Sequence, residues 1–247
     1  MKAHRREFLI ASTVLSISGI AGGMARSFGD PPEKSADPGV KLTDAKKPEA
    51  EAEVSAPEDL MREHGVLNRI LLIYDEGVRR LRAKEDLPPD VLLQTAEIVR
   101  KFLEDYHSKL EENFIFTEFE KRNQMVSLVK TLRAQHAAGR TMTDIVLASA
   151  VPERLGKPAG RDEVVYACAA FVRMYRPHEA REDTIIFPAL HKMLTAETMD
   201  KLGDQFEAEE DRLFGAGGFE KNVARVAEIE KKLGIYELEQ FTAKEKS

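Results

Sequence analysis

The stretch HSKLEENFIF (107–116) returns in a related form as HEAREDTIIF (178–187), 71 residues further along the chain. Aligned at the histidine, both blocks carry a glutamate at the fourth following position, an acid at the fifth, and Ile-Phe at the eighth and ninth. Residues four apart in an α-helix lie about 40° apart around the axis, so each histidine and its glutamate share one face. The repeat therefore predicts two similar helices that each present a His/Glu pair.

Two more histidines extend this pattern. His64 precedes His107 by 43 residues, and His136 precedes His178 by 42 residues. Each interval allows a helix of about 20 residues, a turn and a returning helix, which brings both histidines to nearly the same height. The sequence thus predicts two helical hairpins whose side chains converge at one level: His64, His107, Glu111, His136, His178 and Glu182.

The apolar residues recur at helical spacing along most of the chain, without strand-like alternation. This pattern predicts an all-α fold, an antiparallel four-helix bundle over residues 58–192, with additional C-terminal helices packing on it from residues 193–247. Pro177 lies inside the fourth helix and predicts a kink or local unwinding just before His178. We expect the four helices at about 58–84, 90–117, 118–150 and 162–186.

The N-terminus differs in character from the rest. Residues 1–25 combine a basic start, an apolar stretch and a small residue, which predicts an export signal peptide. RREFL (5–9) resembles the twin-arginine signal, so the predicted location is the periplasm; a Sec-type signal or an uncleaved membrane anchor is the alternative. The apolar run is short for a membrane span, and we expect none in the mature chain. Residues 26–57, with five prolines, predict a disordered linker.

Composition narrows the partners and the kind of site. The formal net charge is −6, and Lys and Arg do not gather with aromatic residues, so no nucleic-acid partner is expected. Cys168 is the one cysteine, which excludes an intrachain disulfide and a thiolate cluster.

Four imidazoles and two carboxylates in an apolar interior need a partner, and metal coordination supplies one. Imidazole and carboxylate without thiolate favour iron, with manganese or zinc as alternatives. If Glu111 and Glu182 each bridge two ions, and the histidines divide two and two, each ion has four protein ligands. A shared oxo or hydroxo bridge then leaves about one open position per ion. Oxygen, nitric oxide or peroxide could bind there.

The ordered set His64, His107-x-x-x-Glu111, His136 and His178-x-x-x-Glu182 resembles the ligand set of the hemerythrin-like, HHE cation-binding family. The similarity runs from REHGVLNRILLIY (62–74) through YRPHEARED (175–183) to LGIYELEQFT (233–242). This resemblance implies a four-helix bundle around a di-iron site.

Two positions depart from the oxygen-carrying members of that family. The carriers have a second histidine one turn from the third-helix histidine, and this chain has Leu132 and Arg140 at those places. They also place an aspartate five residues after the last histidine. Asp183 occupies that place here and is an alternative ligand, although Glu182 completes the repeat. The pattern resembles the non-carrier branch, which includes iron sensors and proteins that repair iron centres.

The first hypothesis for function is a di-iron protein that binds oxygen, nitric oxide or peroxide for sensing, storage or scavenging. The alternatives are a di-iron redox enzyme, of the oxidase, peroxidase, nitric oxide reductase or ferroxidase type, and an iron-handling or iron-centre repair protein. The sequence leaves open whether the protein is an enzyme, and it leaves any protein partner unknown. Tyr106 and Tyr175 flank the pattern and could either hydrogen-bond around the site or serve packing alone.

Overall fold

The computed structural model describes residues 54–88 and 90–243. The predicted signal peptide and all but the last residues of the predicted linker lie outside these residues and stay predictions. Among the described residues every regular element is a helix, which confirms the all-α class. No helix there combines the length and apolar character needed to cross a membrane.

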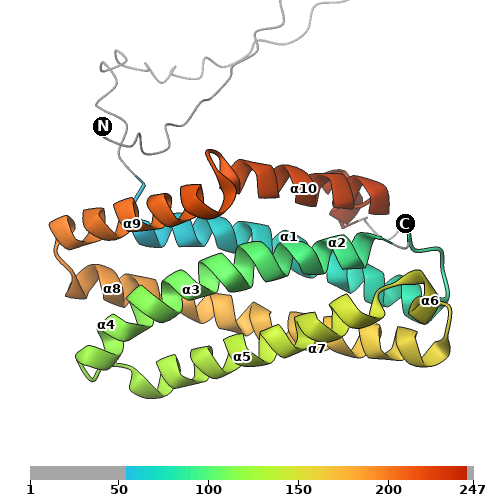
Figure 1. Ribbon diagram of the computed structural model, residues 1–247, viewed down its shortest axis with the longest axis horizontal. Coiled ribbons are helices and arrows are strands. Elements are labelled where there is room, and N and C mark those ends of the chain that lie inside the picture. Colours follow the sequence, from blue (N-terminus) through green and yellow to red (C-terminus); the bar gives the residue numbers. More distant parts are fainter. Residues whose placement is uncertain (1–53, 89, 244–247) are drawn as a thin grey trace, which may run out of the picture. The chain divides into compact units, whose positions relative to one another are not determined.

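Four long helical rods form the bundle (Figure 1). The first is α1 (Ala56–Ala83) and the third is α5 (Val126–Ser149). The second rod consists of α2 (Val91–Ile98), the π-helix η1 (Val99–His107), α3 (Ser108–Leu110), the π-helix η2 (Glu111–Ile115) and α4 (Phe116–Lys121). After the short α6 (Pro152–Leu155), the fourth consists of α7 (Pro158–Arg181), the π-helix η3 (Glu182–Ile186) and α8 (Phe187–Met193). The helix α7 packs against both α1 and α5, and η1 packs against the same two.

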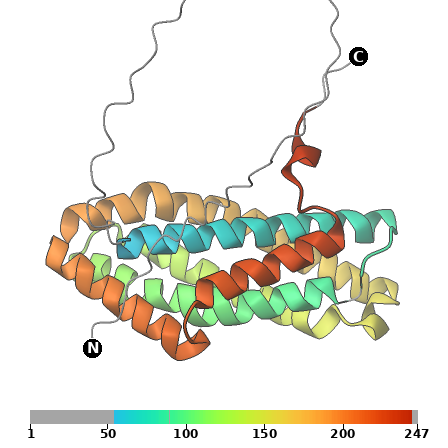
Figure 2. The same ribbon diagram turned by 90° about the horizontal axis from the view of Figure 1, so that it is seen from above.

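A C-terminal hairpin covers one side of this bundle. It comprises α9 (Ala196–Phe214) and α10 (Gly218–Leu233), followed by the 3₁₀-helix η4 (Leu238–Phe241). The helix α10 lies across α1 and α2, and α9 packs against α1 and η1 (Figure 2). Phe206, Val226 and Ile229 are buried in this contact region, and Arg69 of α1 makes two hydrogen bonds to the Glu230 carboxylate at 3.0 and 2.5 Å.

Local signals explain where the first helix begins and why one predicted boundary is wrong. At the start of α1, the Ser55 backbone N–H donates to the Glu58 carboxylate at 2.9 Å, which is half of a capping box. The third helix, expected from about residue 118, begins at Val126 because α4 continues the second rod to Lys121. Asn123 and Met125 then reverse the chain with φ angles of 51° and 49°. Asparagine adopts the left-handed region more readily than most residues, but methionine does not, and no glycine or proline marks the turn.

Gly139 permits a close approach between the third and fourth rods. The helix α5 continues through it without interruption, and a Cβ atom added at this position would lie 2.8 Å from Cε2 of Tyr175. Gly139 lies one turn after His136 in α5, and Tyr175 lies one turn before His178 in α7. Gly139 therefore helps to set the distance between two helices that each carry a histidine.

We expect Gly139→Ala to lower the free energy of unfolding by about 1–2 kcal/mol, because overpacking outweighs the gain in helix propensity. The matched control is Gly65→Ala in α1, where a Cβ atom meets nothing within 4 Å. That variant should gain up to about 1 kcal/mol from helix propensity. Urea unfolding followed by circular dichroism measures both changes. Equal effects of the two substitutions would contradict the tight contact at Gly139.

Candidate metal centre

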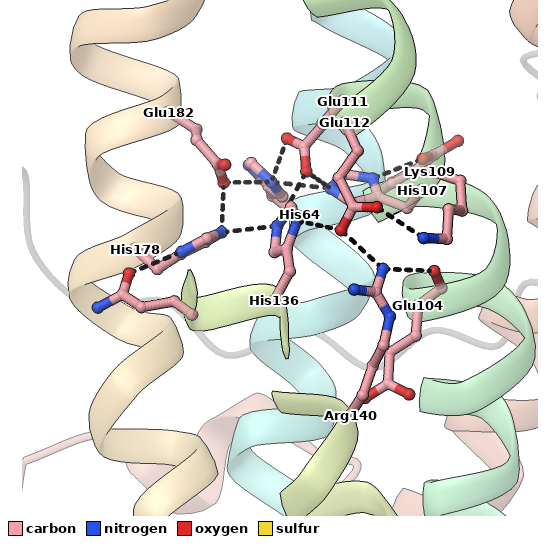
Figure 3. A network of polar contacts seen from close by, with 12 residues as sticks. His64, Glu104, His107, Lys109, Glu111, Glu112, His136, Arg140, His178 and Glu182 are labelled. Carbon is pink, nitrogen blue, oxygen red and sulfur yellow. Dashed lines mark hydrogen bonds and ion pairs between the residues drawn. The ribbon is translucent and has the colours of Figure 1, made fainter. Parts of the chain in front are cut away.

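The six residues expected from the repeat meet inside the bundle, and each is at most 4% exposed (Figure 3). The helices α1 and α5 contribute His64 and His136, and α7 contributes His178. His107 ends η1, while the glutamates begin the other two π-helices, Glu111 in η2 and Glu182 in η3. All four rods thus supply at least one side chain to one buried level.

The six side chains form two groups, one from each hairpin. The ligand atoms of His64, His107 and Glu111 lie within 4.8 Å of one another, and so do those of His136, His178 and Glu182. In the first group the two Nε2 atoms are 3.2 Å apart, and in the second they are 3.1 Å apart. Each group therefore places two imidazole nitrogens and a carboxylate around one point.

Both carboxylates also reach the other hairpin's group. Glu111 lies 3.5 Å from Nε2 of His107 and 3.4 Å from Nε2 of His136. Glu182 lies 3.1 Å from Nε2 of His178 and 3.5 Å from Nε2 of His64. Each glutamate thus stands between the two groups.

The repeated sequence has the same local structure in both halves from its glutamate onward, although His107 lies in the π-helix η1 and His178 in the α-helix α7. Five-residue π-helical segments begin at Glu111 and at Glu182, immediately after α-helical turns that carry no such widening. Single π turns are rare and occur frequently at functional sites. The local unwinding expected just before His178 is absent, because α7 runs through Pro177 to Arg181, and the helix widens only from Glu182 onward. Proline removes one backbone hydrogen bond, and the packing of α7 between α1 and α5 holds the rest of the helix.

Each histidine has an acceptor at its outward ring nitrogen. Nδ1 of His107 lies 2.7 Å from the Glu63 carboxylate, and Nδ1 of His178 lies 2.9 Å from Oε1 of Gln135. A carboxylate or an amide oxygen can only accept, so these contacts place the proton on Nδ1 and direct the Nε2 lone pair inward. The sequence pattern did not identify Glu63 and Gln135. Their signal is that each directly precedes the first-helix histidine of its hairpin.

The acid at the fifth position after the histidine of each block contacts a histidine of the other hairpin. Asp183 lies 2.7 Å from Nδ1 of His64, and Glu112 lies 3.1 Å from Nδ1 of His136. The Asp183 side chain is 36% exposed and stands behind His64, outside both groups of side chains. The repeat therefore extends to the outward hydrogen bonds, in which each block supports a histidine of the other hairpin.

Aromatic rings surround the four imidazoles. Phe116 stacks on His136 at 5.6 Å between ring centroids, and Phe187 stacks on His64 at 5.7 Å. Tyr175 packs its ring edge against His178 at 5.1 Å. Tyr106 lies further out, where its ring contacts Phe102 at 5.7 Å and Phe214 at 5.5 Å. Tyr175 thus touches a histidine of the site directly, whereas the ring of Tyr106 belongs to an aromatic cluster beside it.

Opposing effects shift the titration of these groups. Burial alone would lower the pKa of His136, but its contacts with Glu111 and Glu112 outweigh burial and raise that pKa to about 9. Burial also acts against a charged Glu111, yet the nearby His107 and His136 imidazoles hold its pKa well below the usual range. Burial and the negative charge of Glu111 raise the pKa of Glu182. Without a metal, His136 and Glu182 therefore retain protons that the separate groups would release, whereas burial and the nearby His136 hold the pKa of His178 well below its usual range.

The donor atoms fit a metal. Glu111 and Glu182 bury both carboxylate oxygens, and none of these four oxygens has a hydrogen-bond partner among the described residues. A buried carboxylate without a partner is costly, and coordination to a cation removes that cost. Cys168 is buried in the core cluster and is absent from both groups, so the donors are imidazole and carboxylate. This set suits iron, with manganese or zinc as alternatives.

The metal-free protein should lose stability as the pH rises from about 6.5 to 9. Glu182 and His136 have raised pKa values in the folded protein, so folding binds protons that the unfolded chain has already released, and stability falls as pH increases. One proton retained over one pH unit corresponds to about 1.4 kcal/mol. Urea unfolding of chelator-treated protein at several pH values measures this slope.

Glu182→Gln should flatten that slope, because the amide does not titrate. The exposed Glu153 of α6 offers a control, and Glu153→Gln should leave the slope unchanged. A slope that is the same in both variants would contradict the role of Glu182.

Comparison with known proteins agrees with this geometry. The hemerythrin HHE cation-binding domain model matches residues 55–190 and again residues 127–241. The uncharacterized protein Rv1995 of Mycobacterium tuberculosis and the uncharacterized protein Mb2018 of Mycobacterium bovis are each 47% identical to the chain over 232 residues, covering 93% of it and 89% of each relative. No solved structure gave a significant match. The chain belongs to the hemerythrin HHE cation-binding family, and its two His/Glu clusters are those of a metal-binding protein.

Proposed function

We propose that the protein holds a pair of iron ions between its two hairpins. The ligands in this proposal are His64, His107, Glu111, His136, His178 and Glu182. The observation that carries it is the set of four buried carboxylate oxygens without hydrogen-bond partners among the described residues, facing four inward Nε2 atoms.

The two groups of side chains support a pair of ions in place of one. Each hairpin assembles its own two imidazoles and one carboxylate, with ligand atoms within 4.8 Å. Glu111 and Glu182 also approach the imidazoles of the opposite group, so each can bridge. Two histidines and two shared carboxylates would then hold each ion, which is fewer protein ligands than an iron ion accepts. When bound, such a pair of iron ions supplies redox chemistry and positions for small ligands.

The surroundings of the site favour a small ligand. All six proposed ligands are at most 4% exposed, and Phe116 and Phe187 stack on the histidines. Ile115 and Ile186 are fully buried next to these rings. A large substrate cannot reach such a site without unpacking the core, whereas dioxygen, nitric oxide or peroxide can enter through small fluctuations. We therefore propose binding of one of these molecules, for sensing, storage or scavenging.

Anaerobic loading with ferrous iron should give about two iron ions per chain. The Glu111→Ala, Glu182→Ala double variant should hold less than about one, because both bridging carboxylates are lost. The exposed pair Glu153→Ala, Glu197→Ala is the matched control and should load fully. Metal analysis after gel filtration gives the ratios, and circular dichroism verifies folding. Full loading of the site variant, or less than one metal in the unmodified chain, would contradict the ligand set.

Adding dioxygen to the ferrous protein tests the ligand. We expect a new visible absorption band that disappears when oxygen is removed under argon, as reversible binding requires. Irreversible oxidation with turnover of added peroxide or nitric oxide would instead indicate a redox enzyme. No spectral change with dioxygen, nitric oxide or peroxide would contradict the small-ligand proposal while leaving the metal site intact.

A further inference from the structure

The repeat around the four histidines is broken at one position. The residue before each first-helix histidine contacts the second-helix histidine of the same hairpin: Glu63 contacts His107, and Gln135 contacts His178. In the first hairpin this acceptor is a carboxylate, and in the second it is a neutral amide. Because the other outward acceptors are carboxylates in both halves, this pair is the main chemical difference between two otherwise matched groups.

Carboxylates gather behind the first group. Glu63 and Asp183 each lie 2.7 Å from an Nδ1 atom, of His107 and His64 respectively. Glu63 also forms an acidic cluster with Asp59 and Glu210, whose oxygens lie within 4.8 Å of one another. Arg62 contacts Asp59 at 3.3 Å at the outer edge of this cluster. Both histidines of this group are thus supported by carboxylates.

The second group has a more neutral support. Gln135 carries no charge, and the carboxylate behind His136, Glu112, is itself paired with two cations. Lys109 donates to Glu112 at 2.7 Å and Arg140 donates at 2.8 Å. In Figure 3, Lys109 and Arg140 approach the Glu112 carboxylate from the side that faces away from the two groups of His and Glu side chains. Lys109 and Arg140 therefore largely balance the negative charge of the carboxylate that contacts His136.

A carboxylate that accepts the Nδ1 proton makes the imidazole a stronger donor to a metal, and it stabilises the more highly charged ion. A neutral amide does so less. We propose that the two metal positions are unequal: the position of His64 and His107 binds iron more tightly, and the position of His136 and His178 holds the weaker, more easily reduced ion. Gln135 is the positioning residue that sets this difference. The inference rests on the proposed function and adds which of the two ions exchanges and changes oxidation state first.

Anaerobic calorimetric titration with ferrous iron tests the inequality. The unmodified protein should bind in two steps that differ by about 10-fold or more in affinity. His178→Ala should retain the tight step and His107→Ala the weak one, which assigns each step to its position.

Gln135→Glu should raise the affinity of the weak binding step towards that of the tight step. It should also lower the reduction potential of the more easily reduced iron ion, which is the higher of the two potentials. Gln135 is half-buried, so a carboxylate there keeps partial contact with solvent. Damage to the fold would not raise affinity, so a gain separates this role from a structural one. Glu63→Gln should act in the opposite sense and weaken the tight step by about 10-fold.

The matched control is Gln205→Glu, which adds the same charge at an exposed position of α9 and should change neither step. Two iron ions bound with equal affinity, or no effect of Gln135→Glu on the weak step, would overturn the inference while the di-iron proposal stands. Failure to bind any iron would overturn both.

Discussion

The rest of the structure depends on the burial of Glu111 and Glu182 opposite four imidazoles. Taking one carboxylate out of water costs several kcal/mol unless a charge or hydrogen bonds compensate, and here two carboxylates share one site. Their four oxygens have no hydrogen-bond partner among the described residues, and the apolar shell around them supplies none. Proton retention by Glu182 and His136 reduces that cost only in part. A cation held among these side chains would remove the rest of that cost.

The outward hydrogen bonds explain how such a site is held in shape. Glu63 and Gln135 act within their own hairpins, whereas Asp183 and Glu112 act across to the other hairpin. Both kinds of contact direct the Nε2 atoms inward, and the contacts across also fasten the hairpins to each other at the level of the site. Two of the four contacts that position the imidazoles, those of Asp183 and Glu112, therefore also join the two halves of the bundle.

The C-terminal hairpin extends the core without adding imidazoles to the site. The second family match, residues 127–241, spans α5, α7, α9 and α10, yet α9 and α10 contain no histidine. Their buried residues, among them Phe206 and Ile229, cover α1 and the second rod instead. Glu210 of α9 reaches the acidic cluster behind His107, so this covering hairpin also contributes to the charge around the first group.

The sequence by itself determined the helical class, the two hairpins and the six residues that meet, because helical spacing and the repeated His-x-x-x-Glu block depend only on local geometry. It could not determine the reversal at Asn123 and Met125, because a single asparagine without glycine or proline is a weak turn signal and methionine rarely adopts the left-handed conformation found here. Nor could it determine how α7 passes Pro177, since packing on both sides outweighs the loss of one hydrogen bond. Which of the Glu182 and Asp183 side chains lies among the imidazole Nε2 atoms likewise needed the tertiary structure. The π-helical turn at Glu182 directs the Glu182 carboxylate inward. The neighbouring Asp183 instead contacts His64, which lies 119 residues away in the chain.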